Sequence, residues 1–261
     1  MKRLHTLVAL GMAAVVTLGA GVQAVHAAGT SMVMRMSEDS VDNSKETVFN
    51  YYGQKVAKKA VKDQEGTLAV YKSVDEENPT ENYLFALFKD AKAQKKYVSS
   101  KDMQGFYKAV SAGVTPKGAT NGTPFYVKEI KVPLYTMGIA DTKIVNVETF
   151  DVQEGQTNAV KSVLLNMEHG VERDGQTTKG LGDSSGLYAT YMVTMEDAPD
   201  TIKVIRVFAN SSASDMYNNS AEHKELLEGI SSVVKKYDEK ATRVRVSYNK
   251  GGLTYNAGVG R

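Results

Sequence analysis

Residues 66–110, GTLAVYKSVDEENPTENYLFALFKDAKAQKKYVSSKDMQGFYKAV, align without a gap on residues 186–230, GLYATYMVTMEDAPDTIKVIRVFANSSASDMYNNSAEHKELLEGI. The identical pairs are Gly66/Gly186, Ala69/Ala189, Tyr71/Tyr191, Glu76/Glu196, Pro79/Pro199, Phe88/Phe208, Ala93/Ala213, Tyr97/Tyr217 and Ser100/Ser220. Turn residues fall on turn residues and aromatic residues on aromatic residues across the whole window. The alignment therefore predicts two diverged copies, in tandem, of one small domain.

Along the second copy, segments with the apolar spacing of a strand alternate with segments that have the apolar spacing of a helix. We expect strands at 143–152, 187–195, 202–208 and 242–248, a helix with the face Val160, Val163, Leu164 and Met167, and a helix that opens at Ser220 with the face Leu226, Leu227, Ile230, Val233 and Val234. The acidic turn at 196–199 is typical of a hairpin between the two middle strands. The predicted order is βαββαβ.

The first copy shows the same order. We expect strands at 32–36, 67–74, 83–88 and 126–135, a helix from about Ser44 with the face Val48, Tyr52 and Val56, and one helix over 91–110. This order is the ferredoxin-like arrangement, an antiparallel sheet with both helices on one face. We therefore predict an α+β fold of two tandem ferredoxin-like repeats, repeat 1 at 28–140 and repeat 2 at 141–261.

The N-terminus is typical of a secretory signal peptide. Lys2 and Arg3 precede an uncharged run over 7–24, and Val25-His26-Ala27 gives the small-residue pattern of a cleavage site. We expect residues 1–27 to be removed and the mature protein to be secreted or otherwise extracytoplasmic, without stable membrane insertion. The alternative is an uncleaved anchor, because the apolar run is close to the length that spans a bilayer.

The composition limits the classes of partner. The chain has 32 basic and 30 acidic residues, and the predicted signal peptide carries two of the cations, which leaves 30 of each. A neutral chain with mixed charges has no electrostatic footprint for nucleic acid or for an anionic membrane surface. Cys is absent, which excludes disulfides, a thiolate nucleophile and thiolate metal ligands. The oligomeric state stays open, a homo-oligomer included.

In each copy a strand ending in Phe is followed by a short polar stretch, Ala, an aromatic residue four positions on, then Ser and an amphipathic helix, as in LFALFKDAKAQKKYVSSKDMQGFYKAV and VIRVFANSSASDMYNNSAEHKELLEGI. This pattern resembles the antibiotic-biosynthesis monooxygenase domain of the dimeric α+β barrel superfamily. The resemblance implies ferredoxin-like units whose sheets pair face to face into a barrel, formed here within one chain. Some members oxygenate quinols or polyketide phenols without metal or flavin.

Other members of that family degrade haem, and this chain departs from their pattern at three positions. Glu148 stands where those members have an Asn on the first strand. Phe208, and Phe88 in the first copy, replace the Trp at the end of the third strand. Leu227, and Tyr107 in the first copy, replace the proximal His. The ordinary axial ligand of haem is therefore missing, although Tyr ligates ferric haem in other proteins. Haem degradation is the less favoured alternative.

His223 is the best single candidate for a catalytic residue. The predicted mature chain has two histidines, His169 and His223, which lie at no metal-ligand spacing, and it has neither a nucleophile elbow nor a phosphate loop. His223 shares the apolar stripe of its helix with Leu226 and Ile230. An imidazole there would take a phenolic proton from a substrate. The alternative is a packing residue in the first turn after the Ser220 cap.

Four further residues of repeat 2 are candidates for substrate binding: Tyr191, Arg206, Phe208 and Tyr217. The aromatic members would line an apolar pocket, although their retention in both copies is also what core packing predicts. Arg206 has the same strand parity as Phe208 and therefore shares its face. Its partner is either a ligand oxygen or an acidic neighbour. The Gly-rich segment 170–185 is either a lid or a surface loop.

Together with the resemblance, these residues predict a secreted, cofactor-independent monooxygenase that acts on a quinol or another aromatic small molecule. His223 would be the base, and no metal or other cofactor is expected. The alternative is a non-catalytic small-molecule-binding or stress-response protein on the same barrel, which the relaxed identity between the copies favours. A fold of this kind hosts many functions, so the site must decide.

Overall fold

The computed structural model describes residues 31–130, 135–137, 143–170, 172–173, 176–177 and 180–257. Repeat 1 contains β1 (Val33–Val41), η1 (Asn43–Lys45), α2 (Glu46–Asp63), β2 (Thr67–Asp75), β3 (Glu81–Phe88), α3 (Ala91–Val98), α4 (Lys101–Val110), β4 (Val114–Glu129) and β5 (Tyr135–Met137). Repeat 2 contains β6 (Ile144–Val152), α5 (Thr157–His169), β7 (Glu172–Arg173), β8 (Gln176–Thr177), η2 (Leu181–Asp183), β9 (Leu187–Met195), β10 (Thr201–Phe208), α6 (Ser211–Asn218), α7 (Ala221–Ile230), β11 (Val234–Asn249) and β12 (Thr254–Asn256). The predicted signal peptide, the predicted boundary at 140 and part of the Gly-rich segment lie outside the described residues.

Each repeat forms a four-stranded antiparallel sheet. In repeat 1 the order is β4-β1-β3-β2, and in repeat 2 it is β11-β6-β10-β9. The last strand therefore lies beside the first, as in a ferredoxin-like unit. The predicted α+β fold with two ferredoxin-like sheets is confirmed.

The two sheets join into one closed barrel. β4 continues past β1 to pair with β9 of repeat 2, and β11 continues past β6 to pair with β2 of repeat 1. The strand order β1-β3-β2-β11-β6-β10-β9-β4 then returns to β1. Because every strand in this circuit has two neighbours, the circuit leaves no open sheet edge. The barrel is intramolecular, as the resemblance implies.

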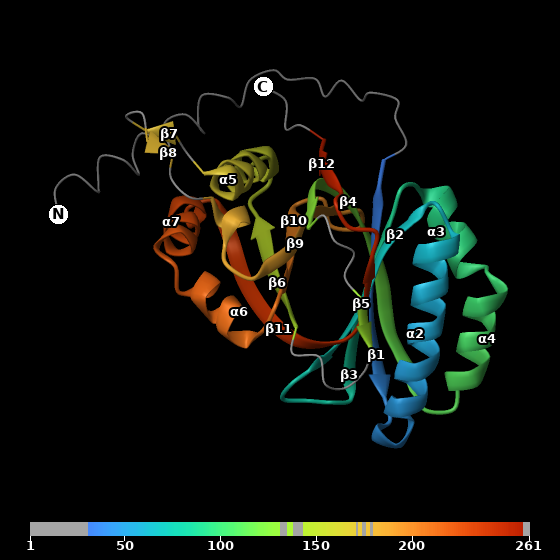
Figure 1. Ribbon diagram of the computed structural model, residues 1–261. Coiled ribbons are helices and arrows are strands. Elements are labelled where there is room, and N and C mark those ends of the chain that lie inside the picture. Colours follow the sequence, from blue (N-terminus) through green and yellow to red (C-terminus); the bar gives the residue numbers. More distant parts are fainter. Residues whose placement is uncertain are drawn as a thin grey trace.

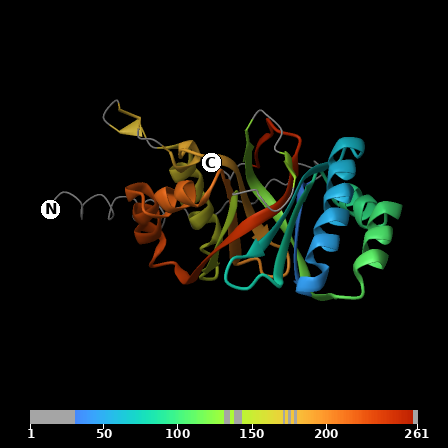
Figure 2. The same cartoon turned by 60° about the horizontal axis from the view of Figure 1, so that its bottom comes forward.

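The helices cover the outside of the barrel on two opposite sides. Figures 1 and 2 show α2, α3 and α4 on one side and α5, α6 and α7 on the other, with the strands between them. On each side an aromatic pair that both copies retain anchors a helix to the sheet: Phe88 with Tyr97 and Phe208 with Tyr217, at ring centroid distances of 5.3 and 5.4 Å. Among the described helices, none is long and apolar enough to cross a membrane.

The helical segments differ from the sequence prediction in three ways. The helix expected over 91–110 is two helices, because Ser100 begins a new one by accepting a hydrogen bond from the backbone N–H of Met103. Repeat 2 has the same pair, and its first member, α6, was not predicted. The last helix ends at Ile230, so Val233 and Val234 do not extend its face.

The buried face of α2 also differs from the predicted one. Val48 and Tyr52 are exposed, whereas Val56 is buried as expected. The helix packs instead through Phe49 and three residues of its last turns, Ala57, Ala60 and Val61. The small alanines bring the helix close to the sheet, a contact that a search for large apolar residues overlooks.

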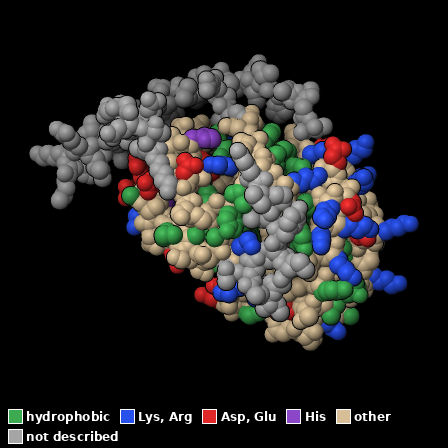
Figure 3. Space-filling model, viewed as in Figure 1, with side chains coloured by type: hydrophobic (Ala, Val, Ile, Leu, Met, Phe, Trp, Pro, Cys, Tyr) green, Lys and Arg blue, Asp and Glu red, His purple; other side chains and the backbone are tan. Residues whose placement is uncertain are grey.

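The near-zero net charge of the sequence conceals an uneven distribution. The helices of repeat 1 carry exposed lysines at 55, 58, 59, 62, 92, 95, 96, 101 and 108, against the acids Glu46, Asp63 and Asp102. The helices of repeat 2 carry Lys161 and Lys224, against Glu168, Asp215, Glu222, Glu225 and Glu228. Figure 3 shows Lys and Arg side chains gathered over the repeat 1 helices.

A chain of hydrogen bonds crosses the barrel interior between the two repeats. The Tyr191 hydroxyl donates to Oε1 of Glu129 at 2.8 Å, so the Tyr71 hydroxyl, 2.8 Å away, donates to Tyr191. Nδ2 of Asn249 donates in turn to Tyr71 at 3.0 Å. Burial raises the pKa of Glu129 to about 7, and its Oε2 has no hydrogen-bond partner among the described residues.

We expect Glu129→Gln to remove a pH-dependent loss of stability. The folded state holds the Glu129 proton up to about pH 7, whereas the unfolded chain releases it near 4.5, so stability falls as pH rises through this window. At pH 8 the variant should be more stable than the wild type by roughly 3 kcal/mol. Urea unfolding at pH 4.5 and pH 8 measures this difference. An equal change at both pH values, or the same gain from the exposed Glu196→Gln, would contradict it.

Candidate functional site

His223 lies buried between α7 and the sheet of repeat 2. Ser220 caps the helix by accepting a hydrogen bond from the His223 backbone N–H at 3.1 Å. Nε2 of the imidazole lies 2.7 Å from Oε1 of Glu148 on β6, and Nδ1 lies 3.2 Å from the carbonyl oxygen of Asn218. Because each ring nitrogen faces an acceptor, the surroundings suit the protonated imidazole, in which both nitrogens donate.

Arg206 joins Glu148 to a second buried carboxylate. Its guanidinium pairs with Glu148 through Nη1 and with Glu168 on α5 through Nη2, the latter at 3.1 Å, and it stands 4.6 Å from the centroid of the Tyr217 ring. The hydroxyls of Tyr217 and Tyr237 donate to Glu148 at 3.1 and 3.3 Å. The sequence left either a ligand oxygen or an acidic neighbour as the partner of Arg206, and the structure shows the acidic neighbour. We call Glu148, Glu168, Arg206 and His223 the ion cluster.

The charges of the ion cluster stabilise one another. Burial raises the pKa of Glu148, but the Arg206 guanidinium and the His223 hydrogen bond outweigh burial and hold this pKa below its usual value. Burial lowers the pKa of His223, but the hydrogen bond and charge of Glu148 outweigh it and raise this pKa. An imidazolium already held by a carboxylate is poorly placed to take a proton from a phenol.

The remaining predicted substrate residues lie on both faces of the sheet. Phe208 packs with Tyr217 in the core under the helices, whereas Tyr191 points into the barrel. The structure therefore brings Arg206, Phe208, Tyr217 and His223 together and separates Tyr191 from them. A role for these residues in substrate binding stays a prediction.

Repeat 1 has small or apolar residues where repeat 2 has the ion cluster. Val33 and Ile144 pair with the equivalent residues Phe88 and Phe208, which makes Ser37 the counterpart of Glu148. The same correspondence relates α2 to α5, since each begins five residues after the preceding strand. The four pairs are Ser37/Glu148, Ala57/Glu168, Ala86/Arg206 and Met103/His223.

A cavity of about 260 Å³ lies between the sheet and the helices of repeat 1. We call it the helix–sheet cavity. Ser37 and Gly53 line it, and their counterparts in repeat 2, Glu148 and Leu164, are larger. Most of the wall is apolar and aromatic, and includes Phe49, Leu84, Tyr97, Met103, Phe106 and Tyr107. Such a lining is typical of a site for a small aromatic molecule.

The helix–sheet cavity also has polar lining residues: Arg35, Asp39, Lys72 and Asn82. Lys72 on β2 is 3% exposed, and its ammonium donates to Asn50 and lies 4.8 Å from the centroid of the Phe49 ring. Burial lowers the pKa of Lys72 to about 7, although Glu46 opposes this shift. Oδ1 of Asn82 is buried and has no hydrogen-bond partner among the described residues.

These groups give the helix–sheet cavity its chemistry. A lysine with a pKa near neutrality exists partly as the free amine, which accepts a proton. Asn82 offers an oxygen that can accept a hydrogen bond from a ligand hydroxyl. In the part of the chain that the structure describes, no cluster of three or more His, Asp or Glu side chains is placed to hold a metal ion.

Lys72 is not among the predicted site residues. Its counterpart in repeat 2 is Met192, so the comparison of the copies does not mark it. A signal was nevertheless present, because Val70, Lys72 and Val74 share one strand face and both valines are buried. A lysine between two core positions of a strand is the pattern that a search for buried cations would have found.

The fold defines the chain as a closed α+β barrel built from two ferredoxin-like repeats. No family model matches the sequence, and no curated protein matches it. Solved structures share the fold at low identity, so the likeness concerns the fold alone.

Three of these structures cover most of the chain. A "putative monooxygenase" from Lactobacillus acidophilus NCFM is 17% identical, with a TM-score of 0.72 over 87% of this chain and 100% of its own. A "putative monooxygenase" from Fusobacterium nucleatum subsp. nucleatum is 14% identical, with a TM-score of 0.74 over 87% and 98%. An "anthrone oxidase-like protein" is 11% identical, with a TM-score of 0.53 over 87% and 97%.

We expect Arg206→Ala to destabilise the protein strongly, because it leaves Glu168 buried without its cation and Glu148 with His223 alone. The loss should be about 3–5 kcal/mol, measured as the free energy of unfolding in urea at pH 7. The control is Arg243→Ala, which removes a partly exposed pair with Glu76 and should cost less than about 1 kcal/mol. Similar losses from both variants would contradict a structural role for the ion cluster.

Proposed function

We propose that repeat 1 binds a phenolic or quinol-type small molecule in the helix–sheet cavity and promotes its oxygenation by O2, with Lys72 as the base. The observation that carries this proposal is a buried lysine with a pKa of about 7 in the wall of a mostly apolar and aromatic cavity. The names of the similar structures, two that read "putative monooxygenase" and one "anthrone oxidase-like protein", support the same class of reaction.

The proposed reaction needs only the substrate, O2 and a base. The neutral amine of Lys72 takes a proton from the phenolic hydroxyl or from an acidic C–H of the substrate, and the ring delocalises the resulting charge. The carbanion gives its electron pair to O2 as a C–O bond forms, and the Lys72 ammonium returns the proton to give a hydroperoxide. Loss of water then leaves a carbonyl, so that a ring methylene group and O2 become a ring carbonyl group and water.

Other residues of the helix–sheet cavity would bind and orient the substrate. The Asn82 amide oxygen would accept a hydrogen bond from the substrate hydroxyl, and the Arg35 guanidinium would stabilise the substrate anion. Phe106 and Tyr107 would pack on the rings and exclude water. The Asn82 hydrogen bond would orient the neutral substrate, whereas the Arg35 interaction would favour the anion that reacts with O2.

The prediction that His223 is the base competes with this proposal. We favour repeat 1 because His223 is already paired with Glu148, whereas Lys72 lines a cavity. The alternative of a non-catalytic binding protein would use the same cavity, and it would bind a phenol without consuming O2.

We expect Lys72→Met to abolish oxygen consumption by the purified protein with anthrone and quinol substrates, by about 100-fold or more. For the wild type, kcat/KM should rise with pH through about 7, as the Lys72 amine loses its proton. The exposed Lys96→Met serves as the matched control, and His223→Gln should retain turnover. Loss of activity in His223→Gln but not in Lys72→Met would instead place the base in repeat 2.

A stability measurement separates this loss from unfolding. The unfolded chain keeps the Lys72 proton up to about pH 10.5 and the folded state only to about pH 7, so stability rises with pH across this window. Lys72→Met, which copies Met192, should therefore be more stable than the wild type at pH 7 by about 1 kcal/mol or more. An inactive variant that is also less stable would not support a catalytic role.

We also propose that the mature protein begins near Ala28 and acts outside the cytoplasm. Two cations, an uncharged run and a Val-x-Ala end support this. N-terminal sequencing of protein recovered from the cell exterior should give Ala28 or a close neighbour as the first residue. Recovery with residues 1–27 intact would show that the segment is an anchor.

A further inference from the structure

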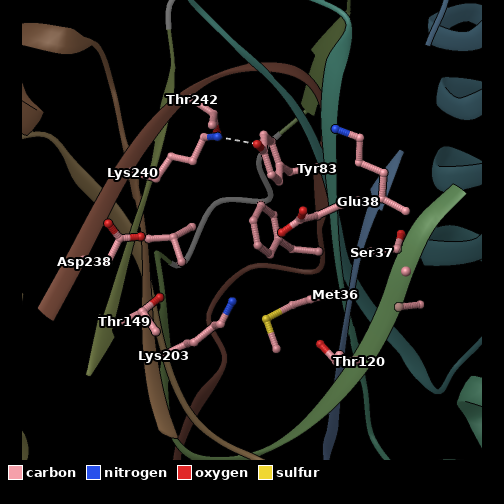
Figure 4. A pocket seen from close by; sticks show the side chains of 15 residues that line it. Met36, Ser37, Glu38, Tyr83, Thr120, Thr149, Lys203, Asp238, Lys240 and Thr242 are labelled. Atoms are coloured by element: carbon pink, nitrogen blue, oxygen red, sulfur yellow. Dashed lines mark hydrogen bonds between the residues drawn. The ribbon is translucent and has the colours of Figure 1, made fainter. Parts of the chain in front are cut away.

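A second cavity, of about 310 Å³, opens at one end of the barrel (Figure 4). We call it the barrel-mouth pocket. Its lining includes residues that correspond between the repeats: Met36/Val147, Glu38/Thr149, Tyr83/Lys203 and Thr120/Lys240. The pocket therefore lies where the repeats face each other. It shares a wall with the helix–sheet cavity, but its lining also includes residues of β6, β10 and β11 of repeat 2 that do not line the helix–sheet cavity.

The inner part of the barrel-mouth pocket is apolar. Met36 and Phe85 are buried members of the hydrophobic cluster that fills the barrel, and Val147 packs against the same cluster. A ligand with an apolar body would therefore displace water from this surface on binding.

Three lysines line the barrel-mouth pocket: Lys117 of repeat 1, which pairs with Glu81, and Lys203 and Lys240 of repeat 2. Lys240 is held by Asp75 at 2.7 Å and donates to the Tyr83 hydroxyl. Lys203 is half-buried, makes no hydrogen bond or ion pair with any described residue, and projects toward the centre of the pocket in Figure 4. In repeat 1 the corresponding positions hold Tyr83 and Thr120, so divergence of the copies has placed two ammonium groups at one side of the pocket.

We propose that the barrel-mouth pocket binds a small amphipathic carboxylate. The carboxylate would pair with the Lys203 ammonium, with the Thr149 hydroxyl as a further donor, and the apolar body would lie on Met36 and Phe85. Lys117 and Lys240 are held by Glu81 and Asp75, so Lys203 is the lining ammonium without a partner among the described residues. A monoanion fits this arrangement better than a phosphate, because the acidic residues Glu38 and Asp238 also line the pocket. This site is independent of the proposed oxygenation in the helix–sheet cavity.

Titration of the mature protein with 2-naphthoate tests this site by fluorescence, since the chain contains no Trp. We expect saturable binding that weakens as salt is added and that weakens at least about tenfold in Lys203→Met, which loses a charge-assisted hydrogen bond. The exposed Lys96→Met should bind as the wild type does, and neutral 2-naphthamide should bind weakly to every variant.

Two results would overturn the proposal. Unchanged 2-naphthoate affinity in Lys203→Met would show that the unpaired ammonium does not hold the carboxylate. Loss of binding in Lys72→Met, with retention in Lys203→Met, would place the carboxylate in the helix–sheet cavity instead. Neither result bears on the oxygenation assay, so the two proposals fail separately.

Discussion

Barrel closure depends on two long strands that serve both sheets. β4 pairs with β1 and then with β9, and Gly122 takes part in both pairings; β11 pairs with β6 and then with β2, and Thr242 takes part in both. A Cβ on Gly122 would lie 3.1 Å from the Cβ of Val193, so a glycine suits the crossing point. Without this sharing, each four-stranded sheet would expose two edges to other chains. The repeats are therefore structurally inseparable.

Barrel closure involves the strands alone, so the side chains between the sheet and the helices can differ between the two repeats. Repeat 2 fills that space with Glu148, Glu168, Arg206 and His223, whereas repeat 1 keeps small residues and a cavity. A buried ion cluster adds little net stability but makes the loss of any member costly. It occupies the space under the repeat 2 helices, and the oxygenation proposed above therefore uses the cavity under the helices of repeat 1.

The sequence determined the repeat, the strand faces and the fold, because these follow from alternation and from an ungapped alignment. It placed Arg206 on the face of Phe208 and His223 on the inner stripe of its helix, and both are correct. It missed the first half of β11, residues 234–241, because polar residues dominate there and pairing with β6, rather than propensity, holds the strand. It missed the ion cluster because ion pairs between distant strands and helices leave no local pattern.

Lys72 and Met192 show most directly what packing alone does not explain. Both occupy the same strand position under the helices, and Met192 is fully buried in an apolar core. A lysine at this depth costs free energy, because burial disfavours its charged form. Repeat 1 bears this cost beside a cavity, with Asn50 and the Phe49 ring positioning the amine. The apolar alternative is present in the same chain, so stability gives no reason for the lysine, whereas the proposed role of Lys72 as a base would give one.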